Sequence, residues 1–204
     1  MTREELEAAL EATDELEGET LRDLSLSGAE WRKKRFEGCR FERCTLDRAT
    51  LRGGVFTECE LEGCDLTMLA AYDVAFRDVR FTRCKLMGVD WSLAYALGFE
   101  VAFEGCQLRY ASFAGMSLRG LLMRDCVADE AVFTGADLRD ACLRGSRFAG
   151  ATFQETTLIG ADLRDAEEVV IDPRSNTLGG TKLSLDAALR AAAFLGVEVP
   201  ELEG

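Results

Sequence analysis

The chain contains no histidine, only two prolines and no long uninterrupted apolar run. Without histidine it lacks the commonest general base, the usual serine and cysteine triads and imidazole metal ligands, so we expect no catalytic residue, metal or cofactor. A transmembrane helix needs about 18 or more apolar residues in succession, which the sequence does not offer. Scarce proline and the lack of low-complexity tracts argue against long disordered linkers. The 204 residues therefore favour one non-catalytic domain outside the membrane.

Positive charge is scarce as well. Lysine and arginine total 24 against 37 aspartates and glutamates, for a net charge of −13. Such a chain is poorly suited to direct nucleic-acid binding. The acidic N-terminus has neither the positive nor the apolar segment of a secretory signal, so we expect a cytoplasmic location.

The acidic excess is uneven along the chain. Residues 1–30 hold ten acids and two bases, residues 31–52 hold eight bases and three acids, and residues 125–172 hold eleven acids and four bases. An acidic C-terminal half is suited to a basic groove on a partner, and it equally serves solubility. Charge alone leaves both interpretations open.

Large apolar residues recur at every fifth position through most of the chain. Neither the helical period of about 3.6 nor the strand period of about 2 fits this pattern, whereas a short fixed period is typical of a solenoid. Like residues also recur every twenty positions, which predicts a coil of four five-residue sides. At a spacing of ~4.8 Å, about seven coils form a rod on the order of 35 Å long. The predicted core ladders are Phe36, Phe56 and Phe76; Phe113, Phe133 and Phe153; and Leu118, Leu138 and Leu158.

The period slips by two residues between Trp91 and Phe103, over residues 92–102. Gly98 lies within this segment and suits a bulge or bend. The slip predicts either a kink in the rod or a small projecting loop for partner contact, and both remain open at this point.

Seven of the eight cysteines occupy a small inward position, two residues before a repeat centre. Because free cysteine behaves as a small buried hydrophobe, we interpret them as packing residues rather than zinc ligands or disulfides. Cys142 departs from this register by one residue. The predicted ladders are Cys44, Cys64 and Cys84; Cys39 and Cys59; and Cys106 and Cys126.

Both ends of the chain depart from the repeat. Thr2 and Glu5 have the spacing of a capping box, which predicts a short N-terminal helix. At the other end, Ser184 begins a second predicted helix and Gly196 ends it. The buried stripe of the first helix is predicted to be Leu6, Ala9, Leu10 and Leu16. The second helix carries an apolar face, part of which is expected to cover the last coil; its residues are Leu185, Ala188, Leu189, Ala192 and Leu195.

These end signals predict three regions. Residues 1–18 form an acidic helical cap, residues 19–168 form the solenoid, and residues 169–204 form a capping and dimerisation segment. An open solenoid exposes unpaired strand edges at its ends, so some covering is required there. An apolar surface larger than one coil can cover is expected to become a two-fold contact between two copies. The residues predicted for this contact are Leu185, Leu189, Ala192, Leu195, Val197 and Val199.

The motif Ala/Cys-Asp-Leu at residues 64–66, 136–138 and 161–163 resembles the pentapeptide-repeat family. This resemblance covers about 145 residues and implies a right-handed quadrilateral β-helix, here with a short helix at each end. Two further segments, residues 90–98 and the stretch from residue 161 to 197, look like the Qnr and MfpA type of member.

That narrower resemblance implies a C-terminal, helix-mediated homodimer whose rod imitates the shape and charge of B-form DNA. It implies binding to DNA gyrase, or in some members to topoisomerase IV, and protection of the enzyme from a poison as a resistance or self-immunity factor. The alternative is a non-catalytic β-helical scaffold for an unrelated protein partner. The acidic residues expected at the partner surface are Asp125, Asp129, Glu130, Asp137, Asp140, Asp162 and Asp165.

Overall fold

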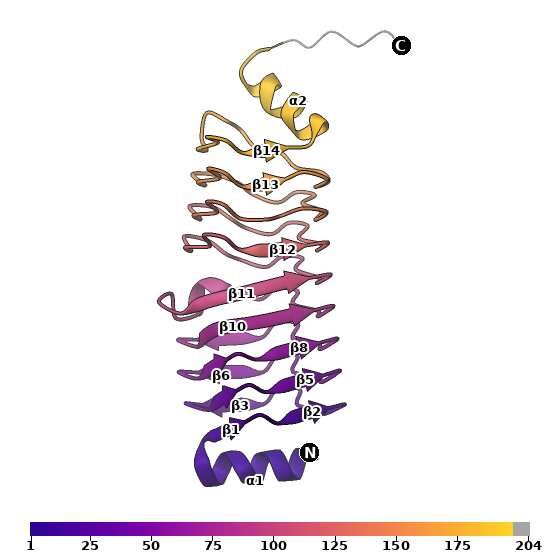
Figure 1. The fold of residues 1–204 in the computed structure, drawn as a ribbon, viewed down its shortest axis with the longest axis vertical. Helices are drawn as coiled ribbons and strands as arrows, with labels where there is room; N and C mark the ends of the chain where they lie inside the picture. Colours follow the sequence, from indigo (N-terminus) through magenta and orange to yellow (C-terminus); the bar gives the residue numbers. More distant parts are fainter. Residues whose placement is uncertain (198–204) are drawn as a thin grey trace.

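The structure is a computed structural model that describes residues 1–197. It is an upright stack of coils with a helix at each end (Figure 1). This confirms the predicted all-β solenoid, with about eight turns rather than seven. The count rises because strand pairing begins at Glu15 and continues to Leu183, beyond the predicted repeat region at both ends.

Each coil has four sides of five residues, and all strand pairs are parallel. The usual register joins residue i to residue i+20, as in Leu16 with Phe36 and Leu21 with Phe41. A residue with positive φ turns the chain at each corner, once in every five residues along most of the rod. The four sides are numbered faces 1 to 4 in chain order, and a corner is named by the two faces it joins.

Faces 1 and 2 are joined where one long strand turns their common corner. Face 1 contains β1 (Glu15–Glu17), β4 (Arg35–Glu37), β7 (Val55–Thr57) and the first part of β10 (Ala75–Thr82). Face 2 contains β2 (Thr20–Arg22), β5 (Arg40–Glu42), β8 (Glu60–Glu62), the rest of β10, β11 (Phe99–Glu104), β12 (Leu122–Arg124), β13 (Asp162–Leu163) and β14 (Lys182–Leu183).

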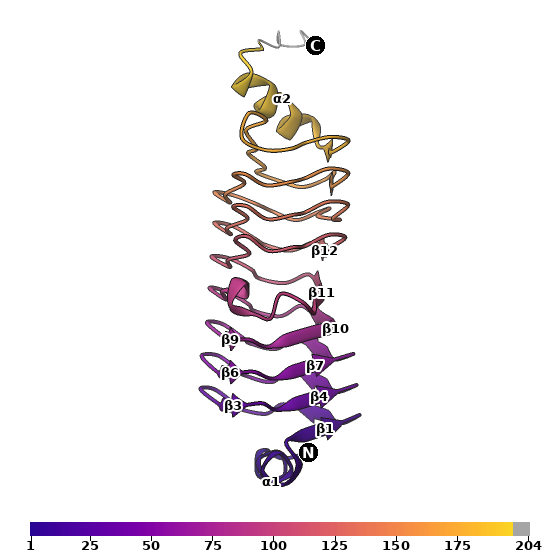
Figure 2. The ribbon, with the colours of Figure 1, turned by 90° about the vertical axis from the view of Figure 1, so that its left-hand side faces the viewer.

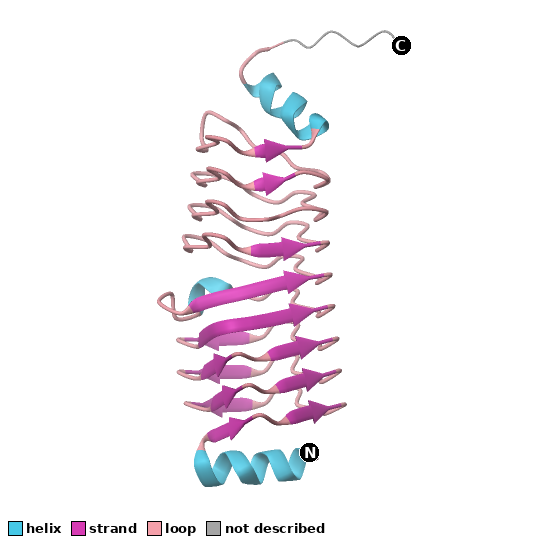
Figure 3. Cartoon of the chain, in the orientation of Figure 1, coloured by secondary structure: helices cyan, strands magenta, loops and turns pink. Residues whose placement is uncertain are grey.

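Face 4 carries a three-stranded sheet, and face 3 is paired by single bridges. The strands of face 4 are β3 (Glu30–Arg32), β6 (Thr50–Arg52) and β9 (Ala70–Tyr72). Face 3 bridges run from Ser25 to Thr45 and on to Asp65. Regular strands are concentrated in the N-terminal half, whereas the C-terminal half is paired mainly by isolated bridges (Figure 3).

A column of aromatic rings runs through the core and changes face partway along the rod. In the N-terminal half Phe36, Phe56 and Phe76 stack on face 1, at centroid distances of 4.7 and 5.5 Å. Trp91 on face 4 contacts Phe76 edge-on at 5.5 Å and stacks with Phe113 of the coil above at 6.3 Å.

Above Trp91 the column continues on face 4. Phe113, Phe133 and Phe153 lie one over the next at 5.2 and 5.0 Å, with each pair of ring planes 4° apart. On face 1 the buried centres of these upper coils are Leu118, Leu138 and Leu158. The insertion therefore coincides with the point where the aromatic ladder passes from one face to another.

The inward cysteines form a longer column than the sequence predicts. The two-residue slip is absorbed between Lys85 and Gln107, which pair as bridge partners, and this joins two predicted ladders into one. All but the last of these thiols donate hydrogen bonds to backbone carbonyls one coil below, and the hydroxyl of Ser146 does the same to Met123 at 3.1 Å; the Cys126 thiol donates to Arg124 in its own coil. The column contains Cys44, Cys64, Cys84, Cys106 and Cys126.

Residues 91–98 form a projecting loop. A 3₁₀ helix, η1 (Trp91–Leu93), leads into a short segment that leaves the rod at the 4/1 corner, to the left of β11 in Figure 1. The slip is completed by a bulge, because Phe76 pairs with Phe99 but Val79 pairs with Val101. Above and below the loop the coils continue as one column (Figures 1 and 2).

The first helix, α1 (Arg3–Thr13), begins with the predicted capping box between Thr2 and Glu5. Leu6 and Leu10 are buried and cover the first coil. The assignment of Leu16 to this helix was wrong. The helix ends at Asp14, which adopts a left-handed conformation, and Leu16 lies in β1 as the first centre of face 1.

The second helix, α2 (Leu185–Phe194), is capped by the hydroxyl of Ser184, which accepts a hydrogen bond from the Ala187 amide. Of the apolar face predicted to cover part of the last coil, only Ala192 is half-buried and the other members are exposed. Ala187 and Ala191 are the buried residues of α2, so the helix rests on the last coil through small side chains. The larger apolar side chains therefore point elsewhere.

Candidate partner-binding surface

The seven acidic residues predicted for partner binding do not form one face, and this part of the prediction was wrong. They are distributed around the rod because their positions within the five-residue repeat differ. Asp137 lies on face 1 and Asp140 at the 1/2 corner; Asp162 lies on face 2, with Asp125 and Asp165 at the 2/3 corner; Asp129 lies on face 3 and Glu130 at the 3/4 corner.

Two of these carboxylates are shared between arginines. Asp129 accepts a hydrogen bond from Arg147 at 3.0 Å and lies 3.5 Å from Arg109. Asp137 contacts Arg119 at 2.7 Å and Arg139 at 3.1 Å. Although burial opposes it, the Arg119 guanidinium lowers the pKa of Asp137 below its ordinary value. Two arginines around one carboxylate leave little negative charge for a partner at either site.

Asp162 and Asp165 are also paired. Arg164 grips Asp162 through two side-chain nitrogens, at 3.0 and 2.7 Å, and lowers the pKa of Asp162 to about 2. Arg144 donates to Asp165 at 2.6 Å. Arg164 is a neighbour of Asp162 in the local sequence, whereas Arg144 lies 21 residues before Asp165 and reaches it only through the solenoid register.

Three of the seven make no ion pair within residues 1–197: Asp125, Glu130 and Asp140. Each turns a corner with positive φ, on three different edges of the rod. The coil above places a glycine over each of them. A side chain at Gly145 or Gly160 would collide with the carboxylate of Asp125 or Asp140, and a Cβ at Gly150 would lie 3.2 Å from the Glu130 side chain. These corners therefore hold exposed negative charge around the rod and not along one side.

The apolar residues predicted for dimerisation fall mostly on the outer surface of α2 and just after it. Leu185 is 73% exposed, Leu189 40% and Leu195 60%, while Ala192 is half-buried and Val197 is exposed. Val199 lies outside the described residues. The exposed leucines form an apolar stripe at the end of the rod, and no other residue within 1–197 covers it.

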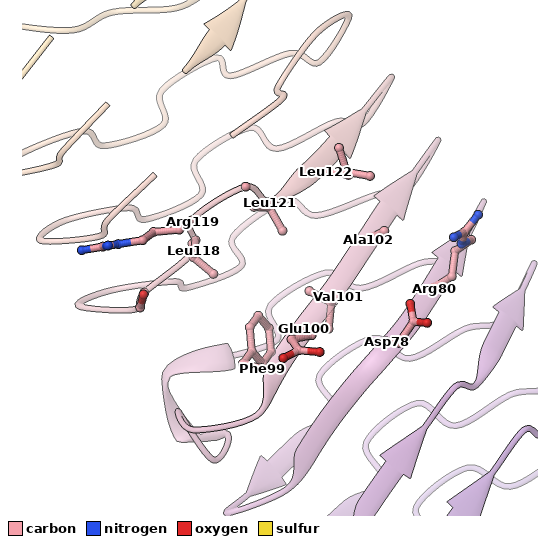
Figure 4. Close-up of a pocket in the computed structure, with 12 residues that line it drawn as sticks. Asp78, Arg80, Phe99, Glu100, Val101, Ala102, Leu118, Arg119, Leu121 and Leu122 are labelled. Atoms are coloured by element: carbon pink, nitrogen blue, oxygen red, sulfur yellow. The ribbon is translucent and has the colours of Figure 1, made fainter. Parts of the chain in front are cut away.

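A groove of about 430 Å³ lies where β10 and β11 meet the next coil (Figure 4). Ala102 pairs with Arg80 below and Leu122 above, and its small side chain leaves the hollow between them. Phe99 and Val101 line it, and charged residues surround it. Sequence reasoning missed this groove; the signal available was the slip, which removes one regular corner at this level. The charged lining residues are Asp78, Arg80, Glu100 and Arg119.

The cysteine column is packing rather than a reactive centre. Its five thiols are buried, and each donates a hydrogen bond to a backbone carbonyl. Within the part of the chain that the structure describes, no group of three or more acidic or cysteine side chains is arranged to hold a metal ion. The same residues include no helix long and apolar enough to cross a bilayer.

Comparison with solved structures shows the fold. A trypsin-treated variant of QnrB1, a plasmid-mediated fluoroquinolone resistance protein, is 20% identical and has a TM-score of 0.58, over 91% of this chain and 100% of that one. HetL, involved in heterocyst differentiation regulation in the cyanobacterium Nostoc sp. strain PCC 7120, is 20% identical with a TM-score of 0.48, over 91% of this chain and 97% of that one. No curated protein sequence matches the chain.

Two family models match the repeats directly. The model described as a pentapeptide repeat region matches residues 55–133. The model described as pentapeptide repeats (8 copies) matches residues 20–57, 35–67 and 131–167. Members of this family are generally non-catalytic. With its coils of four five-residue sides, the chain belongs to the pentapeptide-repeat protein family.

Proposed function

We propose that this protein is a DNA mimic that binds DNA gyrase, or topoisomerase IV as a second target, and protects the enzyme from a poison as a resistance or self-immunity factor. The observation that carries the proposal is the placement of free carboxylates on three edges of a rigid rod. Asp125, Glu130 and Asp140 distribute negative charge around a cylinder, as duplex DNA does. A basic groove built for DNA is complementary to that distribution.

The exposed stripe on α2 supports a homodimer within the same proposal. A two-fold contact through Leu185, Leu189 and Leu195 would place two acidic C-terminal halves end to end and double the length of the charged rod. In this proposal α1 is the acidic cap, and residues 169–204 combine capping with dimerisation.

The likeness to QnrB1 supports the proposal only through a shared fold. QnrB1 is a fluoroquinolone resistance protein, and the two chains share a solenoid over nearly their whole length. An unrelated scaffold function remains the second candidate, because a separate basic surface, described below, is suited to a different partner.

The test is a gyrase supercoiling and cleavage assay with and without a fluoroquinolone. The purified protein is expected to restore supercoiling in the presence of the drug and to reduce cleaved DNA. The triple variant Asp125→Asn/Glu130→Gln/Asp140→Asn should lose most of this effect, since it removes the unpaired charges.

A matched control removes three acids from the other end of the rod: Glu4→Gln/Glu11→Gln/Glu17→Gln. It changes net charge equally and should retain full protection. Equal loss in both variants would assign the effect to total charge and contradict the proposed surface. Absence of any effect on gyrase and topoisomerase IV, tested with several poisons, would end the proposal.

A further inference from the structure

Arg32, Lys33 and Arg52 cluster on face 4 and the 4/1 corner without an acidic partner. Most lysines and arginines of residues 1–197 form ion pairs, commonly with an acid one coil away, as Arg22 does with Glu42. These three side chains form neither an ion pair nor a side-chain hydrogen bond within that range. They lie in and beside β3 and β6, adjacent strands of one sheet.

The register makes this arrangement unfavourable for the isolated protein. Arg32 and Arg52 are direct partners in neighbouring coils, so two like charges face each other across the ladder. Like charges in such positions destabilise a sheet. The next residue in the column is Tyr72, and the Arg52 guanidinium lies 4.2 Å from the centroid of its ring. That stacking holds the guanidinium in place while its N–H groups stay available.

The projecting loop adds apolar surface above these cations, one coil beyond Tyr72. The loop is tied to the coil below, because Asp73 donates its amide to the carbonyl of Leu93 at 2.9 Å and Tyr95 donates to Val74 at 3.0 Å. Leu93 is 37% exposed, Tyr95 44% and Leu97 80%. Figure 2 shows this edge of the rod from the front, with η1 directly above β9.

We propose that this surface, the basic-aromatic corner, binds an acidic segment of a partner protein that also carries a large apolar side chain. Paired arginines recognise carboxylates through bidentate hydrogen bonds, and the loop supplies an apolar contact beside them. Asp73 turns the same corner of the rod two coils above Lys33, and the three cations exceed this one acid by two. The corner consists of Arg32, Lys33, Arg52, Tyr72, Leu93, Tyr95 and Leu97.

The charge distribution favours an acidic peptide over nucleic acid at this site. The acidic residues 1–30 lie mainly below the corner, with ten acids against two bases, and would repel a long polyphosphate that extends past it. A short peptide segment contacts the corner without meeting that repulsion. This proposal does not depend on gyrase binding, since it uses the opposite half of the rod.

The experiment measures fluorescence anisotropy of the full chain with a labelled short peptide of Asp and Glu that has a central Leu-Phe pair. The same peptide with Asn and Gln in place of its acids is the peptide control, and a labelled DNA duplex is the competing class. The acidic peptide is expected to bind, and Arg32→Gln/Arg52→Gln should weaken it about tenfold. Leu97→Ser should weaken it about threefold, since a single exposed apolar contact is lost.

The matched control is Arg80→Gln/Lys182→Gln, which removes two cations that also form no ion pair in the described residues but lie on face 2. It should bind the acidic peptide as the parent does. Thermal unfolding checks that Arg32→Gln/Arg52→Gln is folded; its stability should change little, since relief of the Arg32–Arg52 repulsion offsets loss of the Arg52–Tyr72 contact. Failure of the acidic peptide to bind, equal weakening in the control variant, or preferential binding of the duplex would each overturn the proposal.

Discussion

The two terminal helices are similar in length but contact the solenoid in different ways. In α1 the leucines at positions 6 and 10 are buried against the first coil. In α2 only two alanines are buried, and the leucines at 185 and 189 face outward. Covering the end of a coil thus requires little apolar surface at the C-terminal end. The first helix therefore acts as a cap, whereas α2 retains apolar surface beyond what capping uses.

The largest expected difference is in the free energy of unfolding when a leucine of each helix is shortened to alanine. Leu6→Ala should lower the free energy of unfolding by about 2–5 kcal/mol, because it empties a fully buried position. Leu185→Ala, at a position 73% exposed, should change it by less than about 0.5 kcal/mol. Urea denaturation of both variants measures the difference. Equal losses would contradict the distinction between the helices.

The N-cap residues of the two helices should also differ in how much they stabilise the rod. Thr2→Ala removes the acceptor for the Glu5 amide and should cost about 0.5–2 kcal/mol of rod stability. Ser184→Ala removes the corresponding cap of α2. Since α2 is held mainly through alanines, its fraying should leave the main thermal transition unchanged. A downward shift of that transition in Ser184→Ala as large as in Thr2→Ala would show that both helices cap the rod.

The pH response tests the coil beneath α2. Arg164 lowers the pKa of Asp162 to about 2, so this carboxylate stabilises the folded state above its unfolded pKa of about 3.8, and the contribution disappears as pH falls from about 4 to about 2. Because the pair is partly exposed, the effect should be at most about 1 kcal/mol. The stability gap between the parent and Asp162→Asn should be present at pH 6 and close in strong acid. A constant gap would contradict the pairing.

The smallest expected effect on stability accompanies a large effect on assembly. Leu189 lies on the outer side of α2, so Leu189→Glu should change the free energy of unfolding by less than about 0.5 kcal/mol. If α2 forms the proposed dimer contact, light scattering should show the parent as a dimer and this variant as a monomer. Tyr110→Glu is a matched control, since this exposed side chain lies on the rod far from α2. A parent that is monomeric at all concentrations rules out the contact.

The five-residue period predicted the fold because one buried centre per side is a local property of the sequence. Which face each centre occupies is not local, since it depends on how many residues the insertion adds. Because of the slip, the sequence did not predict that the aromatic column passes from Phe76 through Trp91 to Phe113. For the same reason the single thiol column was predicted as two ladders, the first of which ended at Cys84. Leu16 was misplaced because a helix and a first coil both accept a leucine there.

The candidate site was less predictable than the core. Counting acids located the charged half of the chain, but whether a carboxylate is neutralised depends on arginines in its own or a neighbouring coil. Asp137 and Asp140 are close in sequence, yet one is held by two arginines and the other makes no ion pair in the described residues. The basic-aromatic corner was visible in sequence as a run of bases, while its aromatic and apolar parts became adjacent only through stacking.

The two tryptophans of the chain sit at different heights in the rod, and this gives the protein two built-in optical reporters. Trp31 belongs to the lowest coils and is 8% exposed, whereas Trp91 is fully enclosed beside Phe76 and Phe113. A linear stack whose units touch only their neighbours can lose its end before its middle. Emission from single-tryptophan variants would therefore show whether the rod unravels from the N-terminal end or melts as one unit.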